Sequence, residues 1–122
     1  MSKKTVILGA SGKPNRYSYL AAHKLRSKDH EIVPLSIHKG NVVETEILDL
    51  NKKPEIEEVD TVTMYVNRNH QKEWEDYILS LNPKRIIFNP GAENPSLQSK
   101  AEKQGIETLK ACTLVMLNTG QY

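Results

Sequence analysis

The sequence is short of the features that mark several classes of protein. It has a single cysteine, Cys112, so no disulfide can form within the chain, and we expect a reducing, cytoplasmic location. No apolar run approaches the ~20 residues that span a bilayer, and the first residues lack a signal-peptide core, so we expect no membrane partner. The 17 basic and 15 acidic residues nearly balance, which argues against nucleic acid as the main partner.

Patterns of catalytic and metal-binding residues are also missing. The four histidines are scattered, with no H-E-x-x-H pair and no Cys/His spacing suited to zinc. Cys112 lies in an apolar run, where a thiol is more often inert core than nucleophile. Glu93 is the best single acid, but no base or nucleophile accompanies it at a diagnostic spacing. We therefore expect no metal site, no catalytic residues and no enzymatic activity.

Apolar, β-branched runs alternate along the chain with helical patterns. The 122 residues are enough for one domain with its own core, and we assign residues 1–122 to it. We predict strands at residues 5–8, 31–37, 61–66, 85–88 and 106–109, and helices at about residues 15–27, 71–81 and 95–104. This alternation predicts an α/β fold with a doubly wound, mainly parallel sheet and helices on both faces.

Other stretches are harder to assign. Residues 42–43 and 47–50 fit short strands or an irregular connection, and we expect a turn of helix at residues 55–59. Residues 111–117 fit a closing helix or an extended segment packed on the sheet.

Single residues add detail to these elements. Pro34 removes one donor from the second strand, which predicts that this strand lies near an edge or pairs mainly on one side there. We expect Asn67 or Asn69 to cap the helix at 71–81, and Asn94 to cap the helix after it. Four residues three or four apart predict the core-facing side of the first of these helices: Trp74, Tyr77, Ile78 and Leu81.

The first strand runs into a turn of small residues, Gly9-Ala10-Ser11-Gly12, and then into a helix. Small residues let the backbone approach a diphosphate, and the free N–H groups at a helix start favour an anion. Lys13 and Arg16 lie where cations could flank a phosphate. The turn lacks both the G-x-G-x-x-G fingerprint and a Walker G-K-[ST]. A tight turn that needs glycine, with solvated loop cations beside it, is the alternative interpretation.

The end of the second strand carries Ser36, Ile37, His38 and Lys39. Dinucleotide folds usually hold an acidic residue here, which binds the ribose hydroxyls of NAD. A carboxylate repels a ribose phosphate, whereas a cation attracts it. This segment therefore disfavours NAD and favours an adenosine that carries an additional phosphate.

Three segments resemble one known family. G-A-S-x-x-P-x-R-Y-S at residues 9–18, N-P-G-x-E at residues 89–93 and A-C-T-L-V-M at residues 111–116 are similar to motifs of stand-alone CoA-binding domains. That family is itself similar to the CoA-binding domain of the succinyl-CoA synthetase alpha subunit. The resemblance covers nearly the whole chain and implies a Rossmann-like fold.

The resemblance also implies a set of CoA-binding residues. Gly9, Ala10 and Ser11 would form the diphosphate loop with Lys13 close by, and the helix start beneath it would be Arg16, Tyr17 and Ser18. His38 or Lys39, next to Ser36, would meet the ribose phosphate, although the V-N-P-K of many relatives is replaced here by Leu35-Ser36-Ile37-His38. The base and the far wall would be flanked by Tyr65, Val66 and Asn67 and by Asn89, Pro90, Gly91 and Glu93.

The hypothesis from the sequence is a non-catalytic protein that binds CoA or an acyl-CoA. Two alternatives stay open: a small NADP-dependent oxidoreductase, and a subunit with a nucleotide fold that has lost its ligand. The expected partner is a small nucleotide, and a homodimer is left open.

Overall fold

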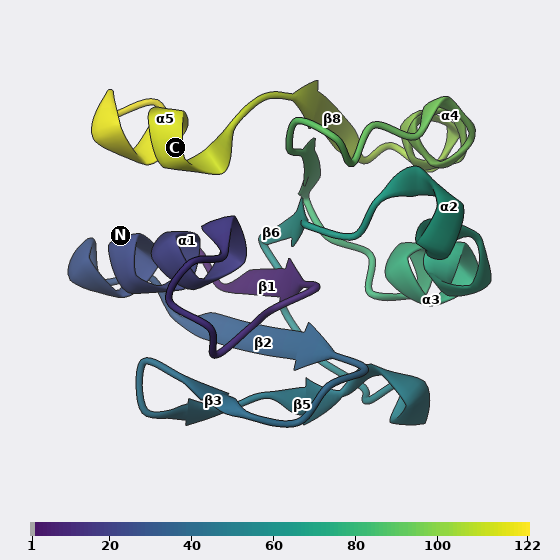
Figure 1. The fold of residues 1–122 in the computed structure, drawn as a ribbon. Helices are drawn as coiled ribbons and strands as arrows, with labels where there is room; N and C mark the ends of the chain where they lie inside the picture. The colour runs from purple at the N-terminus through teal and green to yellow at the C-terminus, as the bar shows by residue number, and fades with distance from the viewer. Residues whose placement is uncertain (1) are drawn as a thin grey trace.

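Six strands form one parallel sheet in the computed structural model, which describes residues 2–122 (Figure 1). Their order is β5-β2-β1-β6-β7-β8, and each neighbouring pair is parallel. The strands are β1 (Thr5–Leu8), β2 (Ile32–Ser36), β5 (Leu48–Asp49), β6 (Thr61–Met64), β7 (Arg85–Phe88) and β8 (Glu107–Lys110). Counted along the chain, this is the 3-2-1-4-5-6 order of Rossmann folds. The predicted doubly wound sheet is confirmed.

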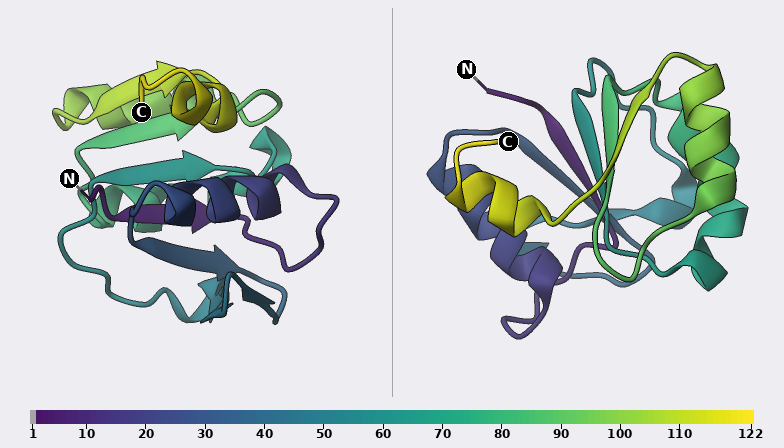
Figure 2. Two further views of the ribbon diagram at one scale, coloured as in Figure 1. Left: turned by 90° about the vertical axis from the view of Figure 1, so that its left-hand side faces the viewer. Right: turned by 90° about the horizontal axis from the view of Figure 1, so that it is seen from above.

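Helices cover both faces of this sheet (Figure 2). One face carries α1 (Tyr17–Ser27) and α5 (Thr113–Asn118), and the other carries α2 (Arg68–Gln71), α3 (Glu75–Ser80) and α4 (Pro95–Lys103). Strand residues alternate between the two layers: Val6 and Leu8 join the core under α3 and α4, whereas Ile7 joins the core under α1. All of β1 is buried, as its apolar run predicts.

Two helices follow their sequence patterns closely. The buried residues of α1 are Ser18, Ala21, Ala22 and Leu25, which lie three or four residues apart on one face of the helix. In α4 the Asn94 Oδ1 accepts a hydrogen bond from the Leu97 amide at 3.2 Å, and Pro95 occupies the first turn. Most of the segment at 111–117 is also helical, because α5 begins at Thr113.

The predicted continuous helix at 71–81 is wrong in two respects. The helical segment begins earlier, at Arg68, and is interrupted by a 3-10 turn, η2 (Lys72–Trp74), before α3. Asn67 occupies the N-cap position but makes no side-chain capping bond. Gln71 and Trp74 are both buried, and three-residue spacing aligns side chains in a 3-10 helix. The 3-10 turn keeps both side chains on the core side of the segment.

The predicted helical turn at 55–59 is also wrong. These residues are irregular, and Lys53 and Glu58 have left-handed backbones, with φ of 45° and 55°. Such residues break a right-handed helix. Ile56 and Val59, three residues apart, still pack against the core beneath α3 and α4.

A hairpin takes the place of a helix between β2 and β5. Its strands are β3 (Asn41–Val42) and β4 (Thr45–Glu46), and the short helix η1 (Leu50–Lys52) follows β5. Because β5 pairs only with Leu35 and Ser36, Pro34 has a ladder partner on the β1 side alone. The prediction from Pro34 is confirmed.

A polar cluster closes the sheet at the amino ends of its strands. The Arg85 Nε donates to the Thr61 Oγ1 at 2.7 Å, and the guanidinium lies 4.3 Å from the centre of the Tyr122 ring. The Lys3 amide donates to the His30 Nδ1 at 2.9 Å. Burial, together with the charges of Lys3 and Arg85, lowers the pKa of His30 below its ordinary value.

This cluster predicts that the free energy of unfolding falls as the pH is lowered from about 7.5 to 5. Protonated His30 loses its acceptor at Nδ1 and adds a charge beside Lys3, so the unfolded chain takes up that proton first. Stability is therefore complete above the ordinary histidine pKa of 6.5 and declines as the pH falls through the lowered value. Urea unfolding at both pH values measures the change.

The control compares two histidine variants. His30→Gln should show a smaller fall than the wild type, and His70→Gln, at an exposed position of α2, should show the wild-type fall. An unchanged pH dependence in His30→Gln would contradict the assignment.

Candidate ligand-binding site

The sequence-predicted site residues lie in or beside the turns at the carboxyl ends of four neighbouring strands, β2, β1, β6 and β7. In parallel sheets these ends meet at one edge, and ligands bind there beside the point where the strand order reverses. Here that switch point lies between β1 and β6. The fold therefore brings the predicted segments to a common edge.

The turn after β1 uses its first two amides for the fold itself. The Leu35 carbonyl accepts from the Gly9 amide at 2.9 Å and from the Ala10 amide at 3.0 Å. Gly9 has a φ of 94°, and a Cβ there would lie 2.9 Å from the Val66 Cγ2 and 3.0 Å from the Tyr65 carbonyl carbon. Packing against the turn after β6 therefore requires glycine at position 9, with or without a bound ligand.

The amides available to an anion come later in the same segment. Five of them donate to no acceptor within residues 2–122: the amides of Ser11, Gly12, Asn15, Tyr17 and Ser18. Helix α1 begins without a side-chain cap and has no acidic residue in its first turn. Its first N–H groups therefore lack a protein acceptor among the described residues, and no carboxylate of its first turn neutralises its dipole, an arrangement that suits a phosphate.

The side chains around these amides differ in exposure. Lys13, Arg16 and Tyr17 are exposed, Tyr17 at 73%. Ser18 is buried in the core beneath α1, so it can offer a ligand only its amide. The cations that the sequence singled out are accessible for pairing with a phosphate.

The turn after β2 is shaped by its serine. The buried Ser36 Oγ accepts from the His38 amide at 3.1 Å, and both His38 and Lys39 are exposed. Sequence reasoning missed Asp49, which pairs in register with Ser36 at the end of β5. The Asp49 Oδ1 accepts from the Asn51 amide at 2.9 Å, so this carboxylate caps η1. A two-residue strand gives too short a pattern to reveal it.

The side chain of Asn89 forms three hydrogen bonds within the protein. Its Nδ2 donates to the Thr63 Oγ1 at 2.7 Å and to the Met64 carbonyl at 2.8 Å. Its Oδ1 accepts from the Thr113 amide at 2.8 Å. The side chain is 3% exposed, so it joins β6, β7 and the start of α5 and does not face solvent.

The remaining residues of the β7 turn are exposed. Pro90, Gly91 and Glu93 lie on the surface, and the Glu93 carboxylate accepts from the Gly91 amide at 2.9 Å. Glu93 therefore holds the shape of its own turn.

The turn after β6 presents two different surfaces. Tyr65 packs in the core under α1, and its hydroxyl is buried without a hydrogen-bond partner among residues 2–122. Burial raises the pKa of Tyr65 above its ordinary value, so the phenol stays neutral. Val66 is half-buried against the opposite core, and Asn67 is exposed.

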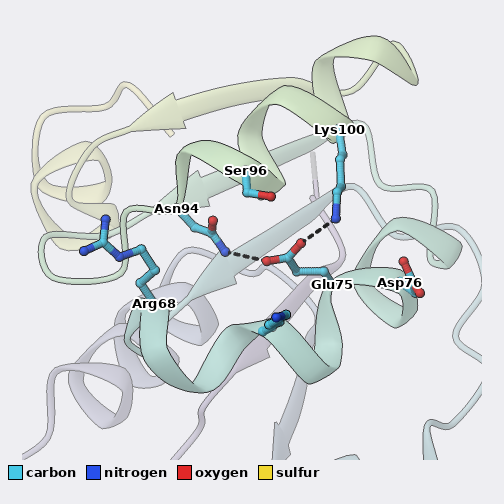
Figure 3. Close-up of a pocket in the computed structure, with 7 residues that line it drawn as sticks. Arg68, Glu75, Asp76, Asn94, Ser96 and Lys100 are labelled. Atoms are coloured by element: carbon cyan, nitrogen blue, oxygen red, sulfur yellow. Dashed lines mark hydrogen bonds and ion pairs between the residues drawn. The ribbon is translucent and has the colours of Figure 1, made fainter.

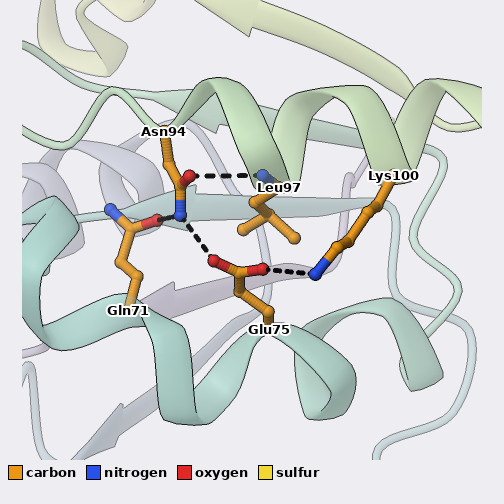
Figure 4. Close-up of polar contacts among 5 residues, drawn as sticks. All are labelled: Gln71, Glu75, Asn94, Leu97 and Lys100. Atoms are coloured by element: carbon orange, nitrogen blue, oxygen red, sulfur yellow. Dashed lines mark hydrogen bonds and ion pairs between the residues drawn. The ribbon is translucent and has the colours of Figure 1, made fainter.

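A buried polar network connects the turns after β6 and β7 (Figure 4). The Gln71 Nε2 donates to the Val66 carbonyl at 2.6 Å and to the Ala92 carbonyl at 2.7 Å. The Asn94 Nδ2 donates to the Gln71 Oε1 and the Glu75 Oε2, both at 3.0 Å. Sequence reasoning found Asn94 as a cap but not Gln71, because a polar residue at a helix start resembles a surface position.

Glu75 ends this network in an ion pair with Lys100 at 3.0 Å. Burial acts to raise the pKa of Glu75, but hydrogen bonds from Asn94 and Lys100 outweigh it and hold that pKa below its ordinary value. Beside the pair is a hollow of about 450 Å³ between α2, α3 and α4 (Figure 3). It is lined by Arg68, Lys72, Glu75, Asp76, Asn94, Ser96 and Lys100.

Three further features of the described residues bear on function. Residues 2–122 contain no group of three or more His, Cys, Asp or Glu side chains that could hold a metal ion. No helix among the described residues has the length and hydrophobicity to cross a bilayer. Cys112, at the N-cap of α5, is partly buried.

Solved structures share this arrangement of strands and helices. An uncharacterized protein is 50% identical to this chain, with a TM-score of 0.96 over 100% of this chain and 99% of the other. A hypothetical protein from Pyrococcus horikoshii OT3 is 18% identical, with a TM-score of 0.83 over 97% of this chain and 83% of its own. A conserved hypothetical protein from Pyrococcus furiosus is 22% identical, with a TM-score of 0.78 over 93% and 97%.

Comparison with curated proteins gives no match. The model of one protein family, described as the CoA binding domain, matches residues 3–118, which is nearly the whole described chain. The motifs that the sequence analysis singled out at residues 9–18, 89–93 and 111–116 all lie within that match. This chain belongs to the CoA-binding domain family.

Proposed function

We propose that this protein binds CoA or an acyl-CoA without transforming it. The observation that carries the proposal is the segment from Ser11 to Ser18, where five amides without protein acceptors lie beside the exposed cations Lys13 and Arg16. An uncapped helix start with cations beside it is a site for a diphosphate. Membership of the CoA-binding domain family makes CoA the first ligand to test.

The residues present fit the charged groups of CoA. The amides of Ser11, Gly12, Tyr17 and Ser18 would hold the diphosphate. His38 and Lys39, exposed after β2, would meet the ribose phosphate through charge-assisted hydrogen bonds. The turns at residues 65–67 and 89–93 would flank the adenine or the pantetheine arm through backbone groups and the exposed Asn67.

The proposal of binding without catalysis rests on how the polar side chains at this edge are used. General acid–base catalysis needs a group within hydrogen-bond reach of the substrate. The Glu93 carboxylate already accepts from the Gly91 amide, and the Asn89 amide is buried among three protein partners. Within residues 2–122, neither the Glu93 side chain nor the Asn89 side chain forms a hydrogen-bonded base–nucleophile pair. An NADP-dependent oxidoreductase and a subunit without a ligand are the outcomes that the following experiments separate from CoA binding.

CoA should raise the melting temperature, and dephospho-CoA should raise it less. A ligand at about 100 times its dissociation constant adds about 2.7 kcal/mol of stability, which corresponds to roughly 10 °C for a domain of this size. Thermal unfolding with CoA, dephospho-CoA and NADPH at equal concentrations measures the order. A larger shift with NADPH than with CoA would favour the oxidoreductase, and no shift with any of the three would favour the subunit without a ligand.

Removing a cation from the first loop should weaken CoA binding. We expect Arg16→Gln to raise the dissociation constant of CoA about tenfold, because a charge-assisted contact to the diphosphate is lost. Arg26→Gln, at the opposite end of the same helix, is the matched control and should bind with wild-type affinity. Calorimetric titration measures both; equal affinities would show that the diphosphate is not bound at the start of α1.

Purified protein should neither release thiol from acetyl-CoA or succinyl-CoA nor oxidise NADPH with simple carbonyl compounds. The reason is the engagement of Glu93 in its own turn. Free thiol and nicotinamide absorbance, followed for hours at high protein concentration, measure the two reactions. Turnover that disappears in Glu93→Gln while CoA affinity is retained would overturn the non-catalytic proposal.

A further inference from the structure

The hairpin β3–β4 lies directly against the first loop. A Cβ placed on Gly12 would come within 2.6 Å of the Asn41 carbonyl oxygen, at the start of β3. Carbon atoms of real side chains do not approach so closely, so only glycine permits this contact. Gly12 is not among the glycines with positive φ, so its backbone conformation does not require glycine. Its missing side chain therefore serves the contact with the hairpin.

The hairpin is held in this position by its own anchors. Val42 and Ile47 are buried in the same core as Ala10 and Ala22, and the Ile47 amide donates to the Gly40 carbonyl at 2.9 Å. The two residues of its turn, Val43 and Glu44, both have left-handed backbones, with φ of 49° and 56°. This is the two-residue turn that matches strand twist, formed here without its usual Asn-Gly.

The segment with His38 and Lys39 is therefore fixed at both ends. At one end, the Ser36 Oγ accepts from the His38 amide. At the other end, Asn41 rests on Gly12. A short segment, residues 37–40, connects these two points, and its residues 37–39 are exposed.

We propose that Gly12 is a specificity-determining position: through its contact with Asn41, it sets how far the cations after β2 stand from the first loop. This inference rests on the proposed function, because it assigns to Gly12 the reading of the ribose phosphate at the same site. The ligand class it selects is a nucleotide whose diphosphate is followed by a phosphorylated ribose. A side chain at Gly12 forces the first loop and the hairpin apart, and so changes the distance between the first loop and the cations His38 and Lys39.

The test is calorimetric titration of the full chain with CoA and with dephospho-CoA. The wild type should prefer CoA, and Gly12→Ala should reduce that preference about tenfold, with dephospho-CoA affinity changed by less than about threefold. Gly105→Ala is the control. It introduces the same side chain at a left-handed glycine after α4 with open space around it, so it should lower stability but keep the preference.

A second pair of variants decides the matter if Gly12→Ala does not fold. Ile47→Ala loosens the hairpin without touching the first loop and should also reduce the preference for CoA. Leu117→Ala removes a buried side chain of the same core from α5 and should leave the preference unchanged. Wild-type preference in a folded Gly12→Ala or Ile47→Ala variant overturns the inference while leaving CoA binding intact.

The wild type by itself separates the two proposals. Equal affinity for CoA and dephospho-CoA overturns the role of Gly12 but not the proposed function. Binding of neither ligand overturns both.

Discussion

The geometry of the ligand edge depends on two buried side-chain amides, those of Asn89 and Gln71. Asn89 bonds to Thr63, to the Met64 carbonyl and to the Thr113 amide, so it holds the end of β6 and the start of α5 to β7. Gln71 donates to the Val66 and Ala92 carbonyls, and so it joins the turn after β6 to the turn after β7. Buried backbone groups without partners are costly, and loops at a sheet edge leave many of them. These two side chains satisfy several at once and so fix the shape of the edge.

This use of polar groups separates the residues that build the edge from those left to meet a ligand. The amides of Gly9 and Ala10, the side chain of Asn89 and the carboxylate of Glu93 are engaged within the protein. Exposed side chains and free amides remain elsewhere, at residues 11–18 and 38–39. Because those groups are amides and cations, the exposed part of the edge suits phosphates.

Much of the fold was predictable because buried strands and helices leave local patterns in the sequence: unbroken apolar runs for strands, and apolar residues three or four apart for helices. Apolar β-branched runs such as Thr5–Leu8 indicated strands buried on both faces, and the stripe in α1 indicated a helix. The errors arose where a local pattern served a distant contact. Ile56 and Val59 have helical spacing but pack on the core from an irregular segment, and Gln71, at the end of α2, bonds to carbonyls of two loops. Such contacts join residues far apart in the sequence, so they produce no regular spacing of residues that a sequence pattern could reveal.

The sequence by itself determined the alternation of strands and helices, the small-residue turn after β1 and the cations beside it, because these depend on local composition. Only the tertiary structure decided what each glycine of that turn is for. Gly9 is required where β1 meets the turn after β6, and Gly12 where the β3–β4 hairpin rests on the loop. Within the sequence the two glycines look alike. They differ because a missing side chain gains its meaning from the backbone that occupies its space, and folding alone brings that backbone there.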